Sequence, residues 1–220
     1  MEGYISAART EMTVRHGSIT DAMAIHLKRA ERAATRGGGP GKQATELPLP
    51  RLAELWDDDS SLVPDGPAHV RRFPVVASWW LLRELEASTL PVAGVSPHSD
   101  SASVHLASSK TDQSGRGTTR TLSCTCEATP VSICPFRVVA AQAEWASTLA
   151  RAKGFALHQF PLFPTAAGCQ ATKAAVSQTT LAIAGQLGLR THIPNGAPRF
   201  SGHSYRATGA VHLASSGIDI

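Results

Sequence analysis

The sequence predicts a mainly helical α+β fold with a small antiparallel sheet. Most of the long segments have the apolar spacing of amphipathic helices, whereas residues 101–109 alternate apolar and polar side chains as a half-buried strand does, and Thr118 to Ser123 is expected to be the return strand. Turn-forming residues from Asp112 to Gly117 lie between these two segments and predict a hairpin. Hydrophobic residues make up 42% of the 220 residues, which is enough for a packed core.

The N-terminal part is expected to contain one long and one short helix. The long helix covers residues 18–36, and the glycine-rich stretch at 37–41 ends it as a linker or sharp loop. Its basic face, which includes Lys28 and Arg29, is interpreted as a solvated surface, and contact with phosphates is the alternative. The short helix begins at Pro50 or Arg51 and extends to Trp56.

The central part is expected to hold the most apolar helix and the hairpin. The helix runs from Val75 to Ser88, and Pro74 suits its first turn. The hairpin follows, with Lys110 near its tip.

The C-terminal part predicts three more helices. They run from Pro135 to Lys153, from Thr172 to Leu187, and from His203 onward, and a glycine follows each of the first two. In the last helix, small apolar residues recur at helical spacing, which predicts a face that packs closely against its neighbours. These residues are Ala207, Ala210, Val211 and Ala214.

Composition excludes some classes of protein. No apolar run approaches the length of a membrane span, and the N-terminus has no apolar signal core before a small-residue cleavage site. We therefore expect a soluble, intracellular protein with no membrane partner. The net charge of +4 and the pI of about 9.1 permit binding to nucleic acid without requiring it.

The four cysteines allow two interpretations. Without a secretion signal, free thiols are the expected state, and we predict no metal site. Cys124, Cys126 and Cys134 nevertheless suggest a zinc-supported interaction module as an alternative. The first spacing is tighter than in the usual zinc motifs, and no second close pair of cysteines follows.

His203 and Arg206 are the first candidates for a functional site. They lie three residues apart at the start of the last helix, so their side chains share one face. The planar guanidinium of an arginine can hold a phosphate with two hydrogen bonds, and a histidine can donate a hydrogen bond or move a proton near neutral pH. The alternative is that both residues merely solvate the end of the helix.

Arg83 is the second candidate, because it is the basic residue of the apolar helix expected from Val75 to Ser88. A charge in such surroundings needs a partner, since an unpaired buried charge is costly. Glu84 or Glu86 can fill this role within the helix, and a phosphate is the other natural partner.

Three short segments together resemble the tyrosine recombinase (phage integrase-like) family. Leu82-Arg83-Glu84-Leu85-Glu86 resembles its first box, Ser109-Lys110-Thr111-Asp112 resembles the hairpin segment with its catalytic lysine, and His203-Ser-Tyr-Arg206 resembles its second box, His-x-x-Arg. The resemblance covers roughly residues 68–220. The Ser-Lys-Thr-Asp and Cys-x-Cys sequences, and the stretch that starts at Phe163, most resemble the corresponding segments of recombinases from eukaryotic mobile elements.

The resemblance implies a domain division and a set of partners. Residues 67–220 would form the catalytic domain, and residues 1–66 would form an N-terminal helical segment and linker, as the tail of a DNA-clamping domain. Double-stranded DNA would be the partner, with a homo-oligomer assembled on it. In a eukaryote, the protein would act in the nucleus.

The resemblance also implies a mechanism for integration or recombination of DNA. Arg83 and Arg206 would hold the oxygens of a DNA phosphate, and His203 would assist by hydrogen bonding and proton transfer. Lys110 would protonate the leaving 5′-oxygen. A tyrosine would attack and form a 3′-phosphotyrosyl intermediate, and neither a metal nor a nucleotide cofactor is needed.

The chain departs from the family pattern after the second box. It ends at Ile220, 14 residues after Arg206, before the second His or Trp and the tyrosine nucleophile that the family places downstream. Of its two tyrosines, Tyr205 is expected about 200° around the helix from His203, as a packing residue, and Tyr4 has no matching context. We therefore expect a fragment or a decayed copy that does not complete cleavage. A non-catalytic DNA-binding remnant with the same fold is the alternative.

Overall fold

The computed structural model describes residues 7, 10–15, 17, 18, 20–35, 44–107 and 117–217. The chain divides into two compact units, residues 1–43 and residues 44–220, and each is considered by itself. In the first unit, helix α2 (Asp21–Thr35) confirms the helix expected over residues 18–36. The Thr20 hydroxyl accepts a hydrogen bond from the backbone N–H of Met23 at 3.3 Å and so caps the helix start. None of the described helices is both long and apolar enough to cross a bilayer.

The second unit includes the segment from residue 44 to residue 66. The short 3₁₀ helix η1 (Leu49–Glu54) lies where a short helix was expected, and its Leu49 and Leu52 are buried in the main core. The backbone N–H of Leu47 donates to the Thr208 hydroxyl at 2.7 Å, which ties this segment to the C-terminal helix. The structure thus divides the chain after residue 43, while the start of a recombinase-like domain at residue 67 stays a prediction.

The sheet contains three antiparallel strands in the order β1 (Val95–Pro97), β2 (Ser101–Leu106) and β3 (Thr118–Ser123). The pairing of β2 with β3 confirms the expected hairpin. On β2, the apolar side chains at positions 102, 104 and 106 are buried, which is the alternation that predicted the strand. The short strand β1 was not predicted, because three residues carry no readable alternation.

Three of the predicted helices are present within two residues of their expected bounds. They are α5 (Pro135–Ala152), α6 (Lys173–Gln186) and α7 (Ser204–Ser215). Gly154 and Gly188 follow the first two with positive φ angles of 74° and 67°, as expected for glycines that end helices. Two further 3₁₀ turns, η2 (Val92–Gly94) and η3 (Val131–Ile133), connect the elements.

The prediction of one continuous helix from Val75 to Ser88 is wrong. The structure has two helices, α3 (Arg72–Trp79) and α4 (Glu84–Thr89), with a sharp turn between them. Leu81 adopts a left-handed conformation (φ 52°), and the N–H groups of Leu81 and Leu82 bond to the carbonyls of Ser78 and Ala77. These bonds form a Schellman motif at the C-terminus of α3, with leucine at the position where glycine is usual. The helix end was therefore not predictable from the residue type.

A side chain from the sheet meets this helix end. The Arg120 guanidinium, from β3, donates to the carbonyl oxygens of Trp80 and Leu81. In return, the Trp80 indole N–H donates to the Arg120 carbonyl at 3.2 Å. A cation at a helix C-terminus satisfies carbonyls that have no partner inside the helix, so these bonds stabilise the break. Arg83, two residues later, becomes the N-cap residue of α4.

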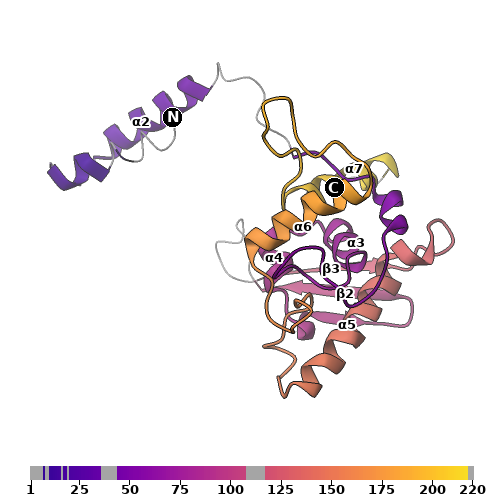
Figure 1. Cartoon of the computed structure of the whole chain (residues 1–220). Coiled ribbons are helices and arrows are strands. Elements are labelled where there is room, and N and C mark those ends of the chain that lie inside the picture. The colour runs from indigo at the N-terminus through magenta and orange to yellow at the C-terminus, as the bar shows by residue number, and fades with distance from the viewer. Residues whose placement is uncertain are drawn as a thin grey trace. The chain divides into compact units, whose positions relative to one another are not determined.

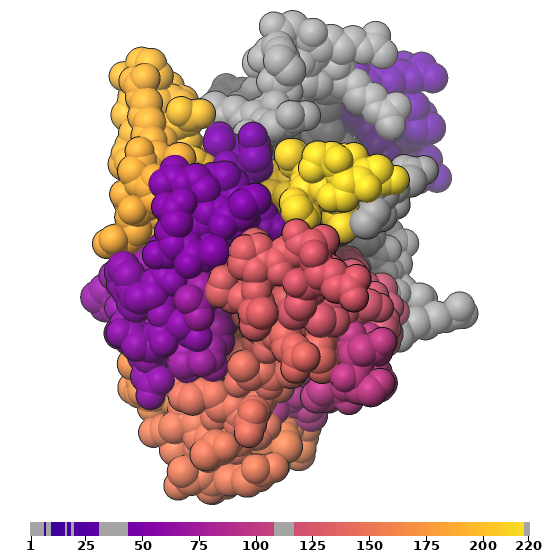
Figure 2. Space-filling model, turned by 90° about the vertical axis from the view of Figure 1, so that its right-hand side faces the viewer, coloured from indigo at the N-terminus to yellow at the C-terminus, as the bar shows by residue number. Residues whose placement is uncertain are grey.

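Helix α3 packs against two of the long helices of the second unit. Helix α5 contacts all three strands, α3 contacts both α5 and α7, and α4 contacts α6. In Figure 1, α5 lies along one side of the sheet, and α6 and α7 lie on the other side of the unit. The space-filling view in Figure 2 shows α7 at the surface next to the segment that contains η1. This packing places the start of α4 close to the start of α7.

The buried face of α7 is not the predicted face of small apolar residues. Val211 is 53% exposed and Ala214 is exposed, whereas the buried residues are Ser204, Tyr205, Thr208, Gly209 and Leu213. The polar members of this face are satisfied inside the protein. The Thr208 hydroxyl donates to the Ser204 carbonyl at 2.8 Å, and the Tyr205 hydroxyl accepts from Thr180 at 2.8 Å. The prediction that the small apolar residues form the buried face of α7 is therefore wrong, because polar side chains are buried where their hydroxyl groups find partners.

Candidate functional site

Arg83 lies in the turn between α3 and α4, and Glu86 holds it there. Its guanidinium forms an ion pair with one oxygen of Glu86 at 2.8 Å, and its backbone N–H donates to the other oxygen at 2.9 Å. The Glu86 side chain is 8% exposed and that of Arg83 is 20% exposed. The partner expected from the sequence is thus present. The broken helix sets the geometry, because both bonds form across the first turn of α4.

Arg120 is a site residue that the sequence did not reveal. It lies on β3 beside Arg83, Arg206 and Glu86, close enough to feel the charge of all three. Burial lowers the pKa of Arg120, the positive charges of Arg206 and Arg83 lower it further, and Glu86 opposes them. On a strand with polar residues on both faces, one arginine carries no pattern that marks it. Only the tertiary fold brings it to the site.

Arg206 reaches the same place from the first turn of α7. A Cβ atom at Gly209 of this helix would collide with the Ser78 carbonyl oxygen, which shows how closely α7 packs against α3. Arg206 is half-buried, and within the described part of the chain it has no hydrogen-bond or ion-pair partner. Arg83 and Arg206 thus both lie near Arg120, although the three residues belong to separate elements, and Glu86 is the carboxylate that pairs with Arg83 and lies near Arg120.

His203 lies at the edge of this cluster, next to Glu84. Its Nδ1 atom is 3.7 Å from one oxygen of Glu84, and the Lys173 ammonium is 3.3 Å from the other. Burial raises the pKa of Glu84, but its own backbone N–H and the charges of His203 and Lys173 outweigh burial and lower the pKa. Gly202 permits this approach, since a Cβ atom there would overlap the Glu84 side chain. The His203 side chain is 60% exposed, so it is accessible to a ligand.

Lys110 lies outside the described residues, as does the stretch from residue 108 to residue 116. The described strands that flank it end with the pairing of Leu106 and Thr118. Whether Lys110 reaches the arginines is therefore untested, and its role stays a prediction.

Tyr205 lies within the second box and points away from the arginines. It is fully buried, its ring packs edge-on against Phe73 at 5.2 Å between centroids, and its hydroxyl bonds to Thr180. Burial raises the pKa of the Tyr205 phenol far above its ordinary value. The prediction that Tyr205 is a packing residue is confirmed, because its oxygen is in the core.

The cluster is suited to an anion. The three arginines have one carboxylate, Glu86, among them, so the cluster has surplus positive charge and unused N–H donors. Like charges that are held together repel each other, and a phosphate between them would relieve the repulsion and accept their hydrogen bonds. The N-terminal end of α7 adds backbone dipoles of the same sign.

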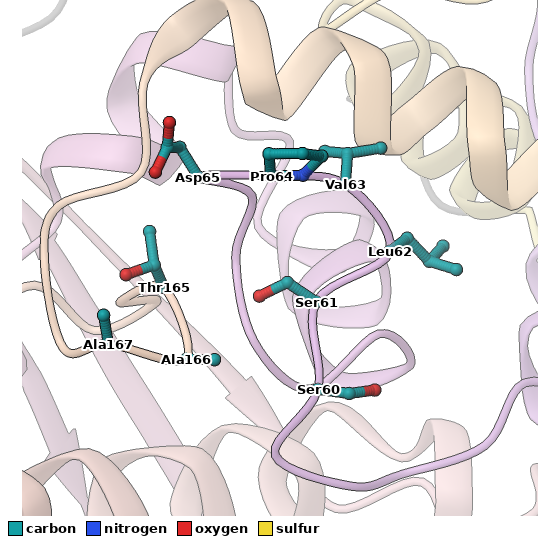
Figure 3. Close-up of a pocket in the computed structure, with 9 residues that line it drawn as sticks. All are labelled: Ser60, Ser61, Leu62, Val63, Pro64, Asp65, Thr165, Ala166 and Ala167. Atoms are coloured by element: carbon teal, nitrogen blue, oxygen red, sulfur yellow. The ribbon is translucent and has the colours of Figure 1, made fainter.

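A separate surface groove of about 480 Å³ lies elsewhere. Figure 3 shows the loop of residues 60–65 facing the turn of residues 165–167 across it. Its lining contains no basic side chain and one carboxylate, Asp65, so it lacks the chemistry for a phosphate.

Similarity to known proteins is found among solved structures and not among sequences. No family model matches the chain, and no curated protein sequence matches it. Two solved structures are similar over 96% of this chain at 14% sequence identity, with TM-scores of 0.54 and 0.53. They are the XerH site-specific recombinase bound to its difH substrate before cleavage, and the same recombinase bound to a palindromic difH substrate after cleavage.

The chain spans about 60% of the length of these two structures. At this identity the similarity establishes the fold, which is a mainly helical α+β fold of the tyrosine-recombinase-like kind. This agrees with the fold class predicted from the sequence.

Proposed function

We propose that this chain binds double-stranded DNA and takes part in site-specific recombination, with one DNA phosphate held by the arginine cluster. The observation that carries the proposal is that Arg83 and Arg206 both lie near Arg120, with Glu86 as the carboxylate of the group. The structural neighbours are recombinases bound to DNA substrates, which supports the same kind of partner here.

The roles within the site follow from the chemistry of phosphoryl transfer. Negative charge builds on the non-bridging oxygens in the transition state, and fixed cations that already point at them lower the barrier. Arg83 and Arg206 would grip these oxygens, and Arg120 would add positive charge beside them. His203 is exposed next to them, so it would donate a hydrogen bond or move a proton. Lys110 would protonate the leaving 5′-oxygen.

We further propose that cleavage uses a 3′-phosphotyrosyl intermediate whose tyrosine is not Tyr205. The Tyr205 oxygen is buried and bonded to Thr180, so it cannot attack a phosphate without unfolding α7. The nucleophile would come from sequence beyond Ile220, and the chain would be a fragment of a longer recombinase or integrase. Its assignment to eukaryotic mobile elements and its nuclear location rest on the sequence resemblance alone.

A second candidate function is DNA binding without cleavage. The buried Tyr205 favours it, because no described tyrosine is accessible as a nucleophile. The arginine cluster serves both functions equally well, so only a test of covalent chemistry separates them.

DNA binding is tested with a mixed-sequence duplex by fluorescence anisotropy at several salt concentrations. Arg206→Gln removes one cation from the cluster, so we expect weaker binding and a salt slope smaller by about 1. Arg151→Gln is the matched control, because it removes an exposed arginine near the end of α5. Equal binding by the two variants and the unchanged protein would show that the cluster is not part of the DNA-binding surface.

Cleavage is tested by covalent trapping on a set of DNA duplexes that are nicked near the scissile phosphate. A chain extended through its natural downstream coding sequence is compared with the 220-residue chain. We expect a protein–DNA adduct only from the extended chain, and we expect Arg206→Ala to abolish it. If neither chain forms an adduct while both bind DNA, the non-catalytic function is correct.

A further inference from the structure

Three cysteines that are separated in the sequence meet at one point of the fold. Cys124 and Cys126 directly follow strand β3, and Cys134 is the residue that precedes helix α5. Their sulfur atoms all lie within 4.8 Å of one another. Cys134 is buried, and the other two are half-buried. The fourth cysteine, Cys169, is exposed on a different segment and does not belong to the group.

The spacing of the sulfurs suits a tetrahedral metal ion. At a Zn–S bond length of about 2.3 Å, two ligands of a tetrahedral zinc are about 3.8 Å apart. The sulfurs of Cys124 and Cys134 are 3.7 Å apart. A disulfide requires about 2.05 Å between the sulfurs, so this separation matches two ligands of one ion better than a covalent bond.

The surroundings of the thiols suit a bound metal thiolate. The backbone N–H of Thr125 donates to the Cys134 sulfur at 3.4 Å, and such bonds orient a metal ligand. The Arg137 side chain, from the first turn of α5, lies beside the sulfurs of Cys126 and Cys124. Three thiolates with one Zn²⁺ carry a net charge of −1, which this guanidinium would balance. No carboxylate or imidazole among the described residues joins the group.

We propose that Cys124, Cys126 and Cys134 bind one Zn²⁺ ion that ties the end of β3 to the start of α5. Three protein sulfurs fill three positions of the tetrahedron, and water fills the fourth. The ion would close the loop from residue 124 to residue 134 next to the core. It would also fix β3, and the Arg120 of the arginine cluster lies on that strand. The proposal stands on these contacts and does not depend on the proposed DNA function.

The position of the loop would let the ion link it to the core. The Ile133 carbonyl, one residue before Cys134, accepts a hydrogen bond from the Trp79 indole N–H at 2.8 Å, so the loop packs against α3. Figure 2 shows the segment that leads from β3 into α5 at the surface of this face. The metal site would thus be open to solvent on one side and anchored to the core on the other.

The test uses the whole 220-residue protein, purified under reducing conditions. Zinc content is measured by elemental analysis, and Co²⁺ is then titrated as a spectroscopic probe, since a tetrahedral thiolate site gives strong charge-transfer and d–d absorption. We expect about one ion per chain, a Co²⁺ spectrum that Zn²⁺ erases, and an unfolding temperature that a chelator lowers. No Zn²⁺ and no Co²⁺ spectrum in the reduced protein would overturn the proposal.

Matched variants assign the ligands. Cys126→Ser and Cys134→Ser should each reduce Co²⁺ affinity by at least tenfold and change the charge-transfer intensity, whereas Cys169→Ser should leave both unchanged. Circular dichroism checks that each variant is folded. If a variant fails to fold, the titration of the unchanged protein still decides the question. Loss of two mass units per chain, without metal, would show a disulfide and overturn the proposal.

Discussion

At the scale of single residues, Arg120 has two roles. Its side chain bonds to the carbonyls that end α3, and its charge lies next to Arg83 and Arg206. The same guanidinium therefore stabilises the helix break and contributes to the surplus positive charge of the cluster. Structural and functional roles for this residue are separable only by a substitution that keeps the charge and loses the planar shape.

Replacement of Arg120 by lysine is such a substitution. Lysine keeps the positive charge, but it cannot reproduce the fork of donors that reaches Trp80 and Leu81. We expect Arg120→Lys to lower the free energy of unfolding by about 1–2 kcal/mol, measured by urea denaturation. Arg151→Lys, at an exposed position, should change it by less than about 0.5 kcal/mol. An equal effect of both changes would show that the carbonyl bonds of Arg120 contribute nothing.

Arg83 and Glu86 show how much of the site the sequence predicted. The expected ion pair is present, because the two residues are three apart and the surroundings are apolar. Arg206 and His203 were also predicted from the sequence. In the fold, Arg206 and Arg83 both lie near Arg120. His203 lies near Glu84, the residue that follows Arg83. The contribution of Arg120 was not predictable, because nothing local marks an arginine on a half-exposed strand as different from a solvated one.

At the scale of elements, the close packing of α7 on α3 decides where Arg206 lies. The two helices approach each other at Gly209, where the Ser78 carbonyl occupies the place of a side chain. The sequence signals for this were weak. The predicted apolar face was wrong, since Ser204 and Thr208 satisfy their hydroxyls within the protein and face the core. The break between α3 and α4 was missed because leucine, not glycine, adopts the left-handed conformation.

A pair of glycine substitutions tests this packing. Gly209→Ala should lower the free energy of unfolding by about 1–3 kcal/mol, because the new methyl group would force α7 away from α3. It should also weaken DNA binding, since Arg206 lies on the same helix. Thermal unfolding and anisotropy measure the two effects.

Gly185→Ala is the matched control for this change. Gly185 lies within α6, and the nearest atom to a new Cβ would be 3.8 Å away, which is an ordinary contact. We therefore expect stabilisation by about 0.5–1 kcal/mol, because alanine favours the helix more than glycine does. If both changes destabilise equally, the close approach at Gly209 is not what limits the helix.

At the scale of the whole molecule, the hydrophobic core of the described residues lies within the second unit. Every residue of the two hydrophobic clusters lies between Leu47 and Leu213. We expect a chain that starts at Ala44 to fold cooperatively, with an unfolding temperature within about 4 °C of that of the full chain. Calorimetry of the two proteins measures this. A large drop would show that residues 1–43 contribute to the stability of the second unit.

The stability of this unit should fall in mild acid. Burial lowers the pKa of both His69 and His212 from the ordinary 6.5. The unfolded chain therefore binds protons at a higher pH than the folded protein does, and stability is lost as the pH falls below about 6.5. Glu84, whose pKa is lowered, adds a further loss below about 4.5. Urea midpoints measured from pH 7.5 to pH 4 follow this trend.

His69→Asn should make that loss smaller. His69 has a positive φ of 59°, a conformation that asparagine tolerates, so the backbone need not change. The variant removes one buried group that must gain a proton on unfolding. A pH dependence as steep as that of the unchanged protein would show that His69 is not a source of the acid sensitivity.

The reciprocal bonds between Trp80 and Arg120 have a consequence for how the unit unfolds. They join the end of α3 to the middle of β3, and the strand pairing holds β3 on β2 up to Leu106 and Thr118. The described part of the hairpin is thus fastened to the end of α3, while the ion pair with Glu86 holds Arg83 at the start of α4. We therefore expect the sheet and the end of α3 to unfold together as one cooperative unit, with similar hydrogen-exchange protection of their amides.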